Sequence, residues 1–410
     1  MHRQPSFGQR LRQLRTERGL SQAALAGDGL STGYLSRLES GARQPNDRVV
    51  AYLAERLGIG AEDFAVCADE TSLAHALTLA VSAESDQAVM ALRDLLATDS
   101  RHERTPRWQA LWMIARIERA DGNRAAERVH LRELVELADE LGLPQLRVRS
   151  RARLARCLRA EGEIGEAMDV AVLACSVARE ADLAVGDLGM ALLALVTVEA
   201  EAGRLPDARA HAEELCALTK GETGPLAVEA LWAAATVRFR QGDHVPAREL
   251  LEEALEAMDS RVDVKLWMRL RLAAASLYLQ LTPPCVPQAR SRLAEAETAL
   301  ELVGTSLHRQ EATTLRAQLA FHEKRYEEAR ALLDGLEGVD LRLTFRDQLR
   351  LSVLCSRLLV QEGRLEEGLR RLRESAQQAQ ESSNVDLAAE IWRTVAETLA
   401  EGRPVPESAG

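Results

Sequence analysis

The stretch GLSQAALA at residues 19–26 is followed, after a Gly27-Asp28-Gly29 turn, by LSTGYLSRLESG at residues 30–41. Ser21 and Ser31 each precede a short run with helical spacing, and serine is a favoured N-cap residue. Glycine tolerates the tight backbone that the turn needs. The stretch therefore predicts two short helices, Gln22–Ala26 and Thr32–Ser40, joined by a compact turn.

The flanking residues extend this pattern to a small all-helical domain. A helix precedes the stretch and ends at Gly19, as a left-handed C-cap residue should. A fourth helix begins at Asn46 or Asp47 and ends at Gly58, and Ala61–Phe64 makes a short fifth. Two short helices joined by a tight turn within five helices match the helix-turn-helix plan.

The charge of this domain fits a polyanionic partner. Residues 1–60 hold nine arginines against five acidic residues, a net charge of +4, whereas the whole chain carries −11. A basic head on an acidic body is typical of a phosphate-binding head. The imbalance is modest, and chance alone could produce it.

Residues 1–66 resemble the DNA-binding domain of the Cro/C1-type (XRE-like) helix-turn-helix regulators of bacteria. The matching positions run in order through nearly the whole domain: Gly8–Arg15, Gly19–Gln22, Leu25-Ala26, Tyr34–Gly41, Arg43, Pro45 and Leu53–Gly58. One departure is visible. The link between Leu25-Ala26 and the next helix is one residue shorter than usual and richer in glycine.

The third helix should lie in the major groove with its first turns at the base edges. The candidate base-reading residues are Thr32, Gly33, Ser36 and Arg37. Arg37 is the strongest reader, because a guanidinium can hold guanine O6 and N7 together, although it could instead clamp a phosphate. Thr32 and Ser36 could contact a base, a thymine methyl group or only water. Gly33 offers no side chain, so DNA shape could carry part of the specificity.

The resemblance implies a phosphate contact for Gln22, reinforced by the amino end of its helix. Tyr34 and Arg43 are further candidate phosphate contacts, with a solvated surface position as the equal alternative. Arg15 and Glu39 match the internal ion pair of the family, which would tie the first helix to the third.

The bulk composition predicts an all-α chain of at least two domains. Aromatic residues make up only 3% of the 410 residues, and helix-forming alanine, leucine, arginine and glutamate dominate. The six cysteines are far apart, so the sequence indicates no metal site and no cofactor. No secretion signal or membrane span is recognisable, which favours the cytoplasm. No catalytic motif occurs, so we expect no enzyme.

Eight helix-stop positions recur through the rest of the chain at intervals of 39–42 residues. Each is followed by an apolar residue and then by a small one, and the positions are 83, 122, 162, 203, 242, 284, 324 and 363. Such regularity indicates a helical repeat array. The predicted divisions are a linker at 67–72, the array at 73–402 and a tail at 403–410.

The repeat unit resembles the tetratricopeptide repeat, whose turn carries a glycine, an apolar residue and an alanine. Departures are His244 at an apolar position, Gly368 at an alanine position and a proline-rich turn near residue 284. The resemblance implies a right-handed superhelical array of about eight hairpins. The complete chain resembles actinobacterial regulators that join these two parts.

A stack of helix pairs forms a concave groove that could hold a peptide, a small molecule or a partner protein. Trp108 and Trp267 could line this groove, although tryptophan side chains are more often buried in the packing between helices. The run Arg147, Arg149, Arg151, Arg153 and Arg156 could bind an anion, but the general preference of the chain for arginine is a simpler explanation.

The combination predicts a transcription regulator that binds double-stranded DNA as a homodimer on an inverted repeat, since one small head buries little DNA surface. The repeat body would support dimerisation and effector sensing. The alternative is a protein-interaction scaffold with an ancillary DNA-tethering head, which predicts weak DNA binding without sequence preference.

Overall fold

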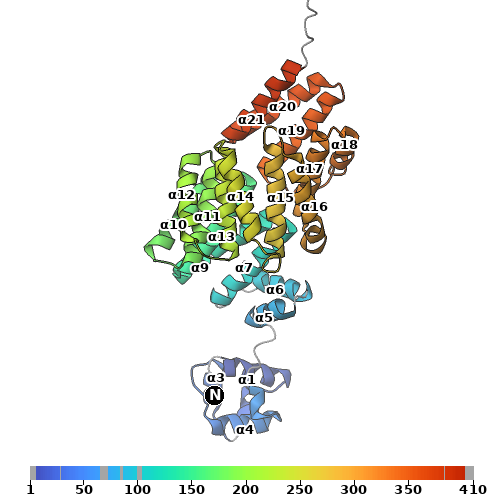
Figure 1. Ribbon diagram of the computed structural model, residues 1–410. Coiled ribbons are helices and arrows are strands. Elements are labelled where there is room, and N and C mark those ends of the chain that lie inside the picture. Colours follow the sequence, from blue (N-terminus) through green and yellow to red (C-terminus); the bar gives the residue numbers. More distant parts are fainter. Residues whose placement is uncertain are drawn as a thin grey trace, which may run out of the picture. The chain divides into compact units, whose positions relative to one another are not determined.

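The structure is a computed structural model that describes residues 6–27, 29–64, 73–83, 86–98, 104–382 and 384–401. Every regular element in these residues is helical, which confirms the all-α prediction (Figure 1). The chain divides into two compact units, residues 1–110 and 111–410. The predicted linker at 67–72 and the predicted tail at 403–410 lie outside the described residues.

The first unit begins with the predicted helical head. Its elements are α1 (Ser6–Glu17), α2 (Gln22–Ala26), α3 (Thr32–Glu39), α4 (Asp47–Leu57) and a 3₁₀ turn (Ala61–Phe64). The fifth element is thus a single 3₁₀ turn, and α3 ends one residue earlier than the sequence suggests. Side-chain oxygens cap three of the helices: Ser21 accepts from the Ala24 N–H, Ser31 from Tyr34 and Asn46 from Val49.

The head has a hydrophobic core of its own. Leucines from α1, α2, α3 and α4 are fully buried in it, and the Phe7 and Phe64 rings close it at a centroid distance of 5.1 Å. All buried members of this core lie between residues 7 and 64. The first unit continues with α5 (Leu73–Ala83), α6 (Asp86–Thr98) and the start of α7 (Arg104–Asp121).

The second unit consists of helices that alternate with short turns. After α7 come α8 (Arg124–Leu141), α9 (Pro144–Glu161), α10 (Ile164–Glu180), α11 (Val185–Glu201), α12 (Leu205–Leu218), α13 (Pro225–Arg240), α14 (His244–Ala257), α15 (Val264–Gln280), α16 (Val286–Val303), α17 (Ser306–His322), α18 (Tyr326–Asp334), α19 (Phe345–Gln361), α20 (Leu365–Glu381) and α21 (Val385–Glu401). Counted from α5, the described helices form eight successive pairs and a final single helix, as the repeat spacing predicts.

The turns explain the repeat pattern. Glycines at the turn positions adopt a positive φ, for example 90° at Gly162 and 85° at Gly242. Lys324 occupies the same place in its repeat and adopts a φ of 62° without being glycine. In five repeats the alanine that follows the turn has no exposed surface, because it lies where the two helices approach each other: Ala167, Ala208, Ala247, Ala289 and Ala329.

Gly368 replaces this alanine in the pair formed by α19 and α20, and the packing shows why. A Cβ atom there would lie 2.5 Å from the Val360 side chain and 2.8 Å from the Ser356 carbonyl oxygen. The two helices therefore approach more closely than an alanine would allow.

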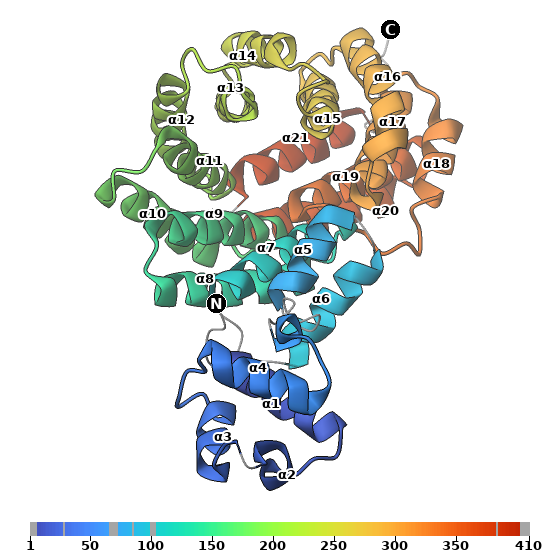
Figure 2. The ribbon, with the colours of Figure 1, turned by 90° about the horizontal axis from the view of Figure 1, so that it is seen from below.

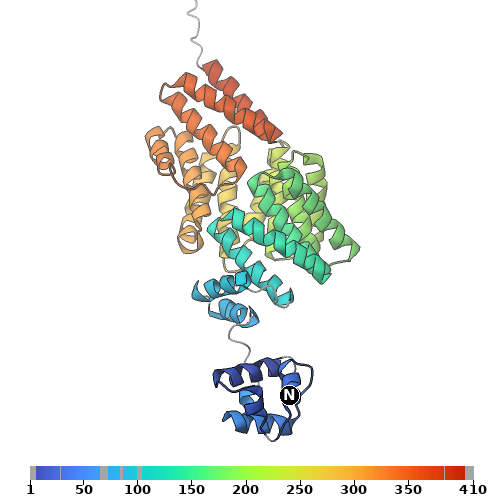
Figure 3. The same ribbon diagram turned by 180° about the vertical axis from the view of Figure 1, so that it is seen from behind.

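Within the second unit the pairs follow one another so that α11, α13 and α15 lie on the inside and α10, α12 and α14 on the outside (Figure 2). The last three helices pack side by side, with α20 against both α19 and α21 (Figure 3). Early and late repeats also meet. The Arg124 guanidinium at the start of α8 donates to the Leu343 carbonyl oxygen at 2.8 Å.

Candidate functional site

The four predicted base-reading residues share one exposed surface on the first two turns of α3. Thr32, Gly33, Ser36 and Arg37 are all exposed, while Leu35 and other apolar residues of α3 face the core of the head. The Arg37 Nε atom donates to the Gly33 carbonyl oxygen at 3.1 Å, which leaves the terminal guanidinium nitrogens in solvent. A Cβ atom at Gly33 would meet nothing within 4 Å. The surface is therefore open to a docking partner.

Glu39, at the last turn of α3, is the buried polar centre of the head. Its carboxylate receives both Arg15 Nε, at 2.7 Å, and Arg15 Nη2, at 3.1 Å, and the Gln22 side-chain amide donates to it at 2.8 Å. Burial alone would raise the pKa of Glu39, but the hydrogen bonds from Arg15 and Gln22 outweigh burial and keep its pKa below the ordinary value. This network joins α1, α2 and α3.

The predicted phosphate contacts have different surroundings. The Gln22 amide is engaged with Glu39, so in this conformation its side chain orients α2 within the head. The exposed Arg43 guanidinium lies 4.7 Å from the centre of the Tyr34 ring, a cation–π contact that holds the arginine beside α3. Gln22, Tyr34 and Arg43 thus border the α3 surface, and their contact with DNA remains a prediction.

The short glycine-rich link between α2 and α3 is held by α4. The Tyr52 hydroxyl donates to the Ala26 carbonyl oxygen at 2.8 Å and accepts from the Gly29 N–H at 3.1 Å. A Cβ atom at Gly29 would lie 2.5 Å from the Tyr52 ring. The glycine is therefore required by the close approach of Tyr52, which sets the path from α2 to α3.

The second unit contains a cavity of about 380 Å³ among its inner helices. Residues of α9, α11, α13, α15, α17 and α19 line it. The lining is mixed. It includes the apolar residues Leu193, Val196, Trp232, Leu272 and Leu315, the arginines 156, 159, 240, 269, 346 and 350, and the acidic residues Glu201, Glu229, Glu311 and Asp347.

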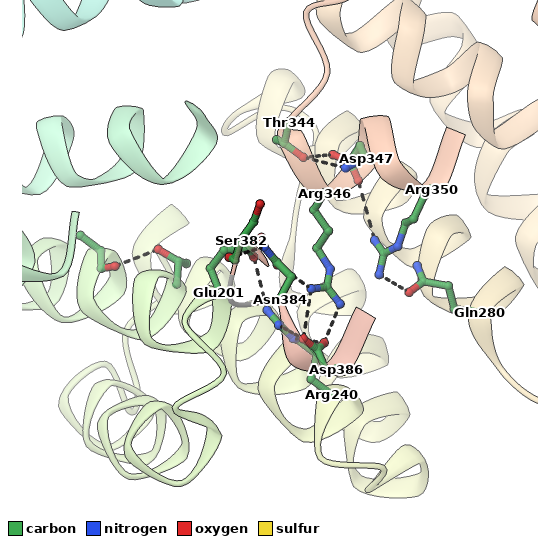
Figure 4. Close-up of polar contacts among 12 residues, drawn as sticks. Glu201, Arg240, Gln280, Thr344, Arg346, Asp347, Arg350, Ser382, Asn384 and Asp386 are labelled. Carbon is green, nitrogen blue, oxygen red and sulfur yellow. Dashed lines mark hydrogen bonds and ion pairs between the residues drawn. The ribbon is translucent and has the colours of Figure 1, made fainter. Parts of the chain in front are cut away.

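One edge of this cavity carries a cluster of ion pairs (Figure 4). Asp386, on α21, accepts from Arg240 on α13 at 2.7 Å and from Arg346 on α19 at 2.5 Å. The Asn384 side chain accepts a further hydrogen bond from Arg346 at 3.2 Å. Burial by itself would raise the pKa of Asp386, but the two arginines hold it well below its usual range.

Comparison with protein families separates the two parts of the chain. Residues 6–66 match the family of the helix-turn-helix domain, and residues 187–260 match the tetratricopeptide repeat. The chain joins a helix-turn-helix domain to tetratricopeptide repeats. No curated protein matches the sequence.

Two solved structures of Rap proteins support the same fold, and a third structure is only a weaker match. A Rap protein complexed with Competence and Sporulation Factor matches with a TM-score of 0.53 and 12% identity, covering 97% of this chain and 100% of that one. The Rap conjugation gene regulator of plasmid pLS20, in complex with the Phr* peptide, matches with a TM-score of 0.53 and 12% identity, covering 94% and 98%. Bacillus thuringiensis PlcR, in complex with the peptide PapR7 and DNA, matches with a TM-score of 0.42 and 13% identity, covering 75% and 98%.

The sequence did not suggest Trp232 as a groove residue, and a groove position for Trp108 and Trp267 stays a prediction. Trp232 lines the cavity, whereas neither Trp108 nor Trp267 is among its lining residues. Trp108 is buried, and the Trp267 ring lies under the Arg271 guanidinium at 3.5 Å. Trp232 precedes the turn glycine Gly242 by ten residues, and Trp112 has the same spacing to Gly122.

None of the described helices has the length and apolar character needed to cross a membrane. Among the same residues, no group of histidine, cysteine and acidic side chains is arranged to hold a metal ion.

Proposed function

We propose that this protein is a cytoplasmic, non-enzymatic transcription regulator that binds specific sequences of double-stranded DNA. Its helix-turn-helix domain would read the duplex, and its tetratricopeptide body would support dimerisation and effector sensing. The exposed surface of Thr32, Gly33, Ser36 and Arg37 on α3 carries the proposal, because it offers hydrogen-bonding groups at the turns of the helix that enter the major groove.

The internal contacts of the head support this role. A recognition helix must be held rigidly, since binding residues need defined positions before they meet their target. Glu39 ties α3 to α1 and α2, and Tyr52 fixes the link that leads into α3. Among the described residues of the head, no buried side-chain nitrogen or oxygen atom lacks a hydrogen-bond partner, so the head presents α3 from a well-connected scaffold.

We also propose that two copies bind an inverted repeat with half-sites roughly 34 Å apart, one turn of the DNA helix. A single head buries too little DNA surface for tight binding. The effector could be a peptide, a small molecule or a partner protein. A peptide is one of these candidates because the pLS20 regulator, which has a similar fold, was solved in complex with the Phr* peptide.

Selection of bound duplexes from a random pool, followed by gel-shift titration, tests the DNA-binding proposal. We expect a palindromic sequence to emerge, and Arg37→Ala to lose preference for it over a scrambled duplex. Arg48→Ala removes the same charge from the start of α4 and should keep the preference. If the full-length protein binds all duplexes equally and only at low salt, the proposal fails and a scaffold with a DNA-tethering head becomes the better interpretation.

A further inference from the structure

The cavity of the repeat body contains arginines that the protein itself does not neutralise fully. Arg240 and Arg346 are paired with Asp386. The other arginines of the lining have no carboxylate at hydrogen-bond distance: Arg156, Arg159, Arg269 and Arg350. Arg350 donates instead to the neutral Gln280 side chain at 2.6 Å, and Asp347 lies 3.7 Å from it. These four form a positively charged surface inside a chamber of mixed apolar, polar and acidic lining.

The nearest carboxylates are too few and too distant to satisfy them. Arg156 and Arg269 share Glu229 at 3.7 and 3.8 Å, distances too long for hydrogen bonds. The buried Nε atom of Arg159 has no hydrogen-bond partner, and the same is true of the Arg350 Nε atom. Buried donors without acceptors are rare in native proteins, and each needs an explanation such as a bound ligand.

The pKa values of the cavity residues also indicate that these arginines are incompletely neutralised. Burial lowers the pKa of Arg159 and of Arg269, and the neighbouring charge of Arg156 lowers both further. The charge of Arg156, followed by burial, also lowers the pKa of nearby Arg119 to about 9. Burial raises the pKa of Glu311 to about 7, so this carboxyl group is only partly ionised at neutral pH. For Arg159 and Arg269, burial and the charge of Arg156 thus outweigh the nearby carboxylates of Glu201 and Glu229, which raise the two pKa values.

The remaining lining is suited to an apolar group. The Trp232 ring faces the cavity, and the Arg269 guanidinium lies 5.3 Å from its centre. Leu193, Val196 and Leu272 continue the apolar surface. A volume of about 380 Å³ falls within the range of pockets that take compact organic ligands.

We propose that this cavity binds a small organic anion whose carboxylate or phosphate group is held by Arg156, Arg159 and Arg269 and whose apolar part packs against Trp232. Guanidinium groups bind both kinds of anion through paired, charge-assisted hydrogen bonds. The inference deepens the proposed function by giving the effector a chemical class, and only its regulatory consequence rests on that function.

Isothermal titration of the full-length protein with four probes tests the assignment. Octanoate and octyl phosphate carry both required parts, octanamide lacks the charge, and inorganic phosphate lacks the apolar chain. We expect saturable binding of one or both amphipathic anions, at least about tenfold tighter than octanamide or phosphate. The comparison of octanoate with octyl phosphate identifies the preferred anion. Equal binding of octanamide and both anions, or no binding of either anion, would overturn the proposal.

The variant Arg159→Gln provides a second readout that distinguishes loss of the site from misfolding. Because it removes an unpaired, repelled charge, we expect the ligand-free protein to unfold at a higher temperature while anion affinity falls about tenfold or more. Arg370→Gln is the matched control, since Arg370 is exposed on α20 and pairs with Glu374. It should change neither quantity. Unaltered anion affinity in Arg159→Gln would contradict the assignment.

A gel shift with and without the bound anion separates this inference from the proposed function. A protein that binds octanoate but no specific duplex would retain the anion site and lose the regulatory role. A protein that binds its duplex but neither anion would retain the DNA-binding role and lose the anion site.

Discussion

Arg240 and Asp386 are 146 residues apart in the sequence, yet the Arg240 Nε atom donates to the Asp386 carboxylate at 2.7 Å. Arg240 ends α13, in the middle of the repeat body, and Asp386 is the second residue of its last helix. Repeat arrays are normally held together by contacts between neighbouring units. This pair, together with Arg346, therefore couples the carboxyl end of the array to its middle.

Asp386→Asn should destabilise the repeat body by about 3 kcal/mol, because it leaves the buried Arg346 without its anion and leaves Arg240 with only Glu201, at 3.4 Å. The side chains of Arg240 and Arg346 are only 7% and 10% exposed. Urea unfolding followed by circular dichroism measures the effect. The control is Asp259→Asn, since Asp259 pairs with Arg261 in solvent and its loss should leave the unfolding curve unchanged. Equal curves for both variants would show that the cluster contributes nothing to stability.

The same cluster predicts a pH dependence. Because the two arginines lower the pKa of Asp386 in the folded protein, its contribution to stability is complete above the ordinary aspartate pKa, about 4. The contribution is lost as the pH falls through the lower, folded-state pKa. The difference in unfolding free energy between the wild type and Asp386→Asn should therefore be constant from pH 6 to 8 and shrink below about pH 4. A difference that grows on acidification would have the wrong sign.

Gly368→Ala tests the close approach of α19 and α20. Alanine is the usual residue at this repeat position, but here its methyl group would overlap the Val360 side chain and the Ser356 carbonyl group. We expect a loss of about 1–3 kcal/mol in unfolding free energy. Gly165→Ala is the control, because a Cβ atom at Gly165 of α10 would meet nothing within 4 Å. That variant should be neutral or slightly more stable.

The repeat spacing allowed the turns of the body to be predicted because each turn is a local structure. Lys324 is an example. Its place in the repeat matches the turn glycines of the other repeats, and it adopts the same left-handed backbone conformation as those glycines. The contact of Asp386 with Arg240 could not be predicted in this way, since it depends on small rotations that accumulate over several repeats.

In the head, too, the features set by neighbouring residues could be predicted, whereas the contact of a distant residue with the turn could not. Its N-caps, Ser21 and Ser31, are set by neighbouring residues and were visible in the sequence. The role of Tyr52 was not, because it reaches the Gly27–Gly29 turn from α4. In the body, inner helices are apolar on more than one side, so periodicity could not show that Trp232 rather than Trp267 lines the cavity.

Arg43→Ala should weaken binding to all duplexes alike, because an exposed guanidinium beside α3 is placed for a phosphate and not for a base. The slope of log affinity against log salt concentration should fall by about 1, the loss of one phosphate contact. Titration at four salt concentrations measures this slope. Arg261→Ala, which removes an exposed arginine from the repeat body, should leave the slope unchanged. A loss of sequence preference in Arg43→Ala would instead assign Arg43 to base reading.

Tyr52→Phe tests whether the link between α2 and α3 controls DNA binding. Phenylalanine keeps the ring against Gly29 but removes the hydroxyl that bonds to the Ala26 carbonyl oxygen and the Gly29 N–H. We expect a loss of about 1–2 kcal/mol in the stability of the head and weaker binding to the selected duplex, since the entry into α3 is no longer held. Tyr326→Phe, in the repeat body, removes a hydroxyl for which no hydrogen bond is found and serves as the control. If Tyr52→Phe is destabilised but binds the duplex with wild-type affinity, α3 must be positioned by the Glu39 network alone.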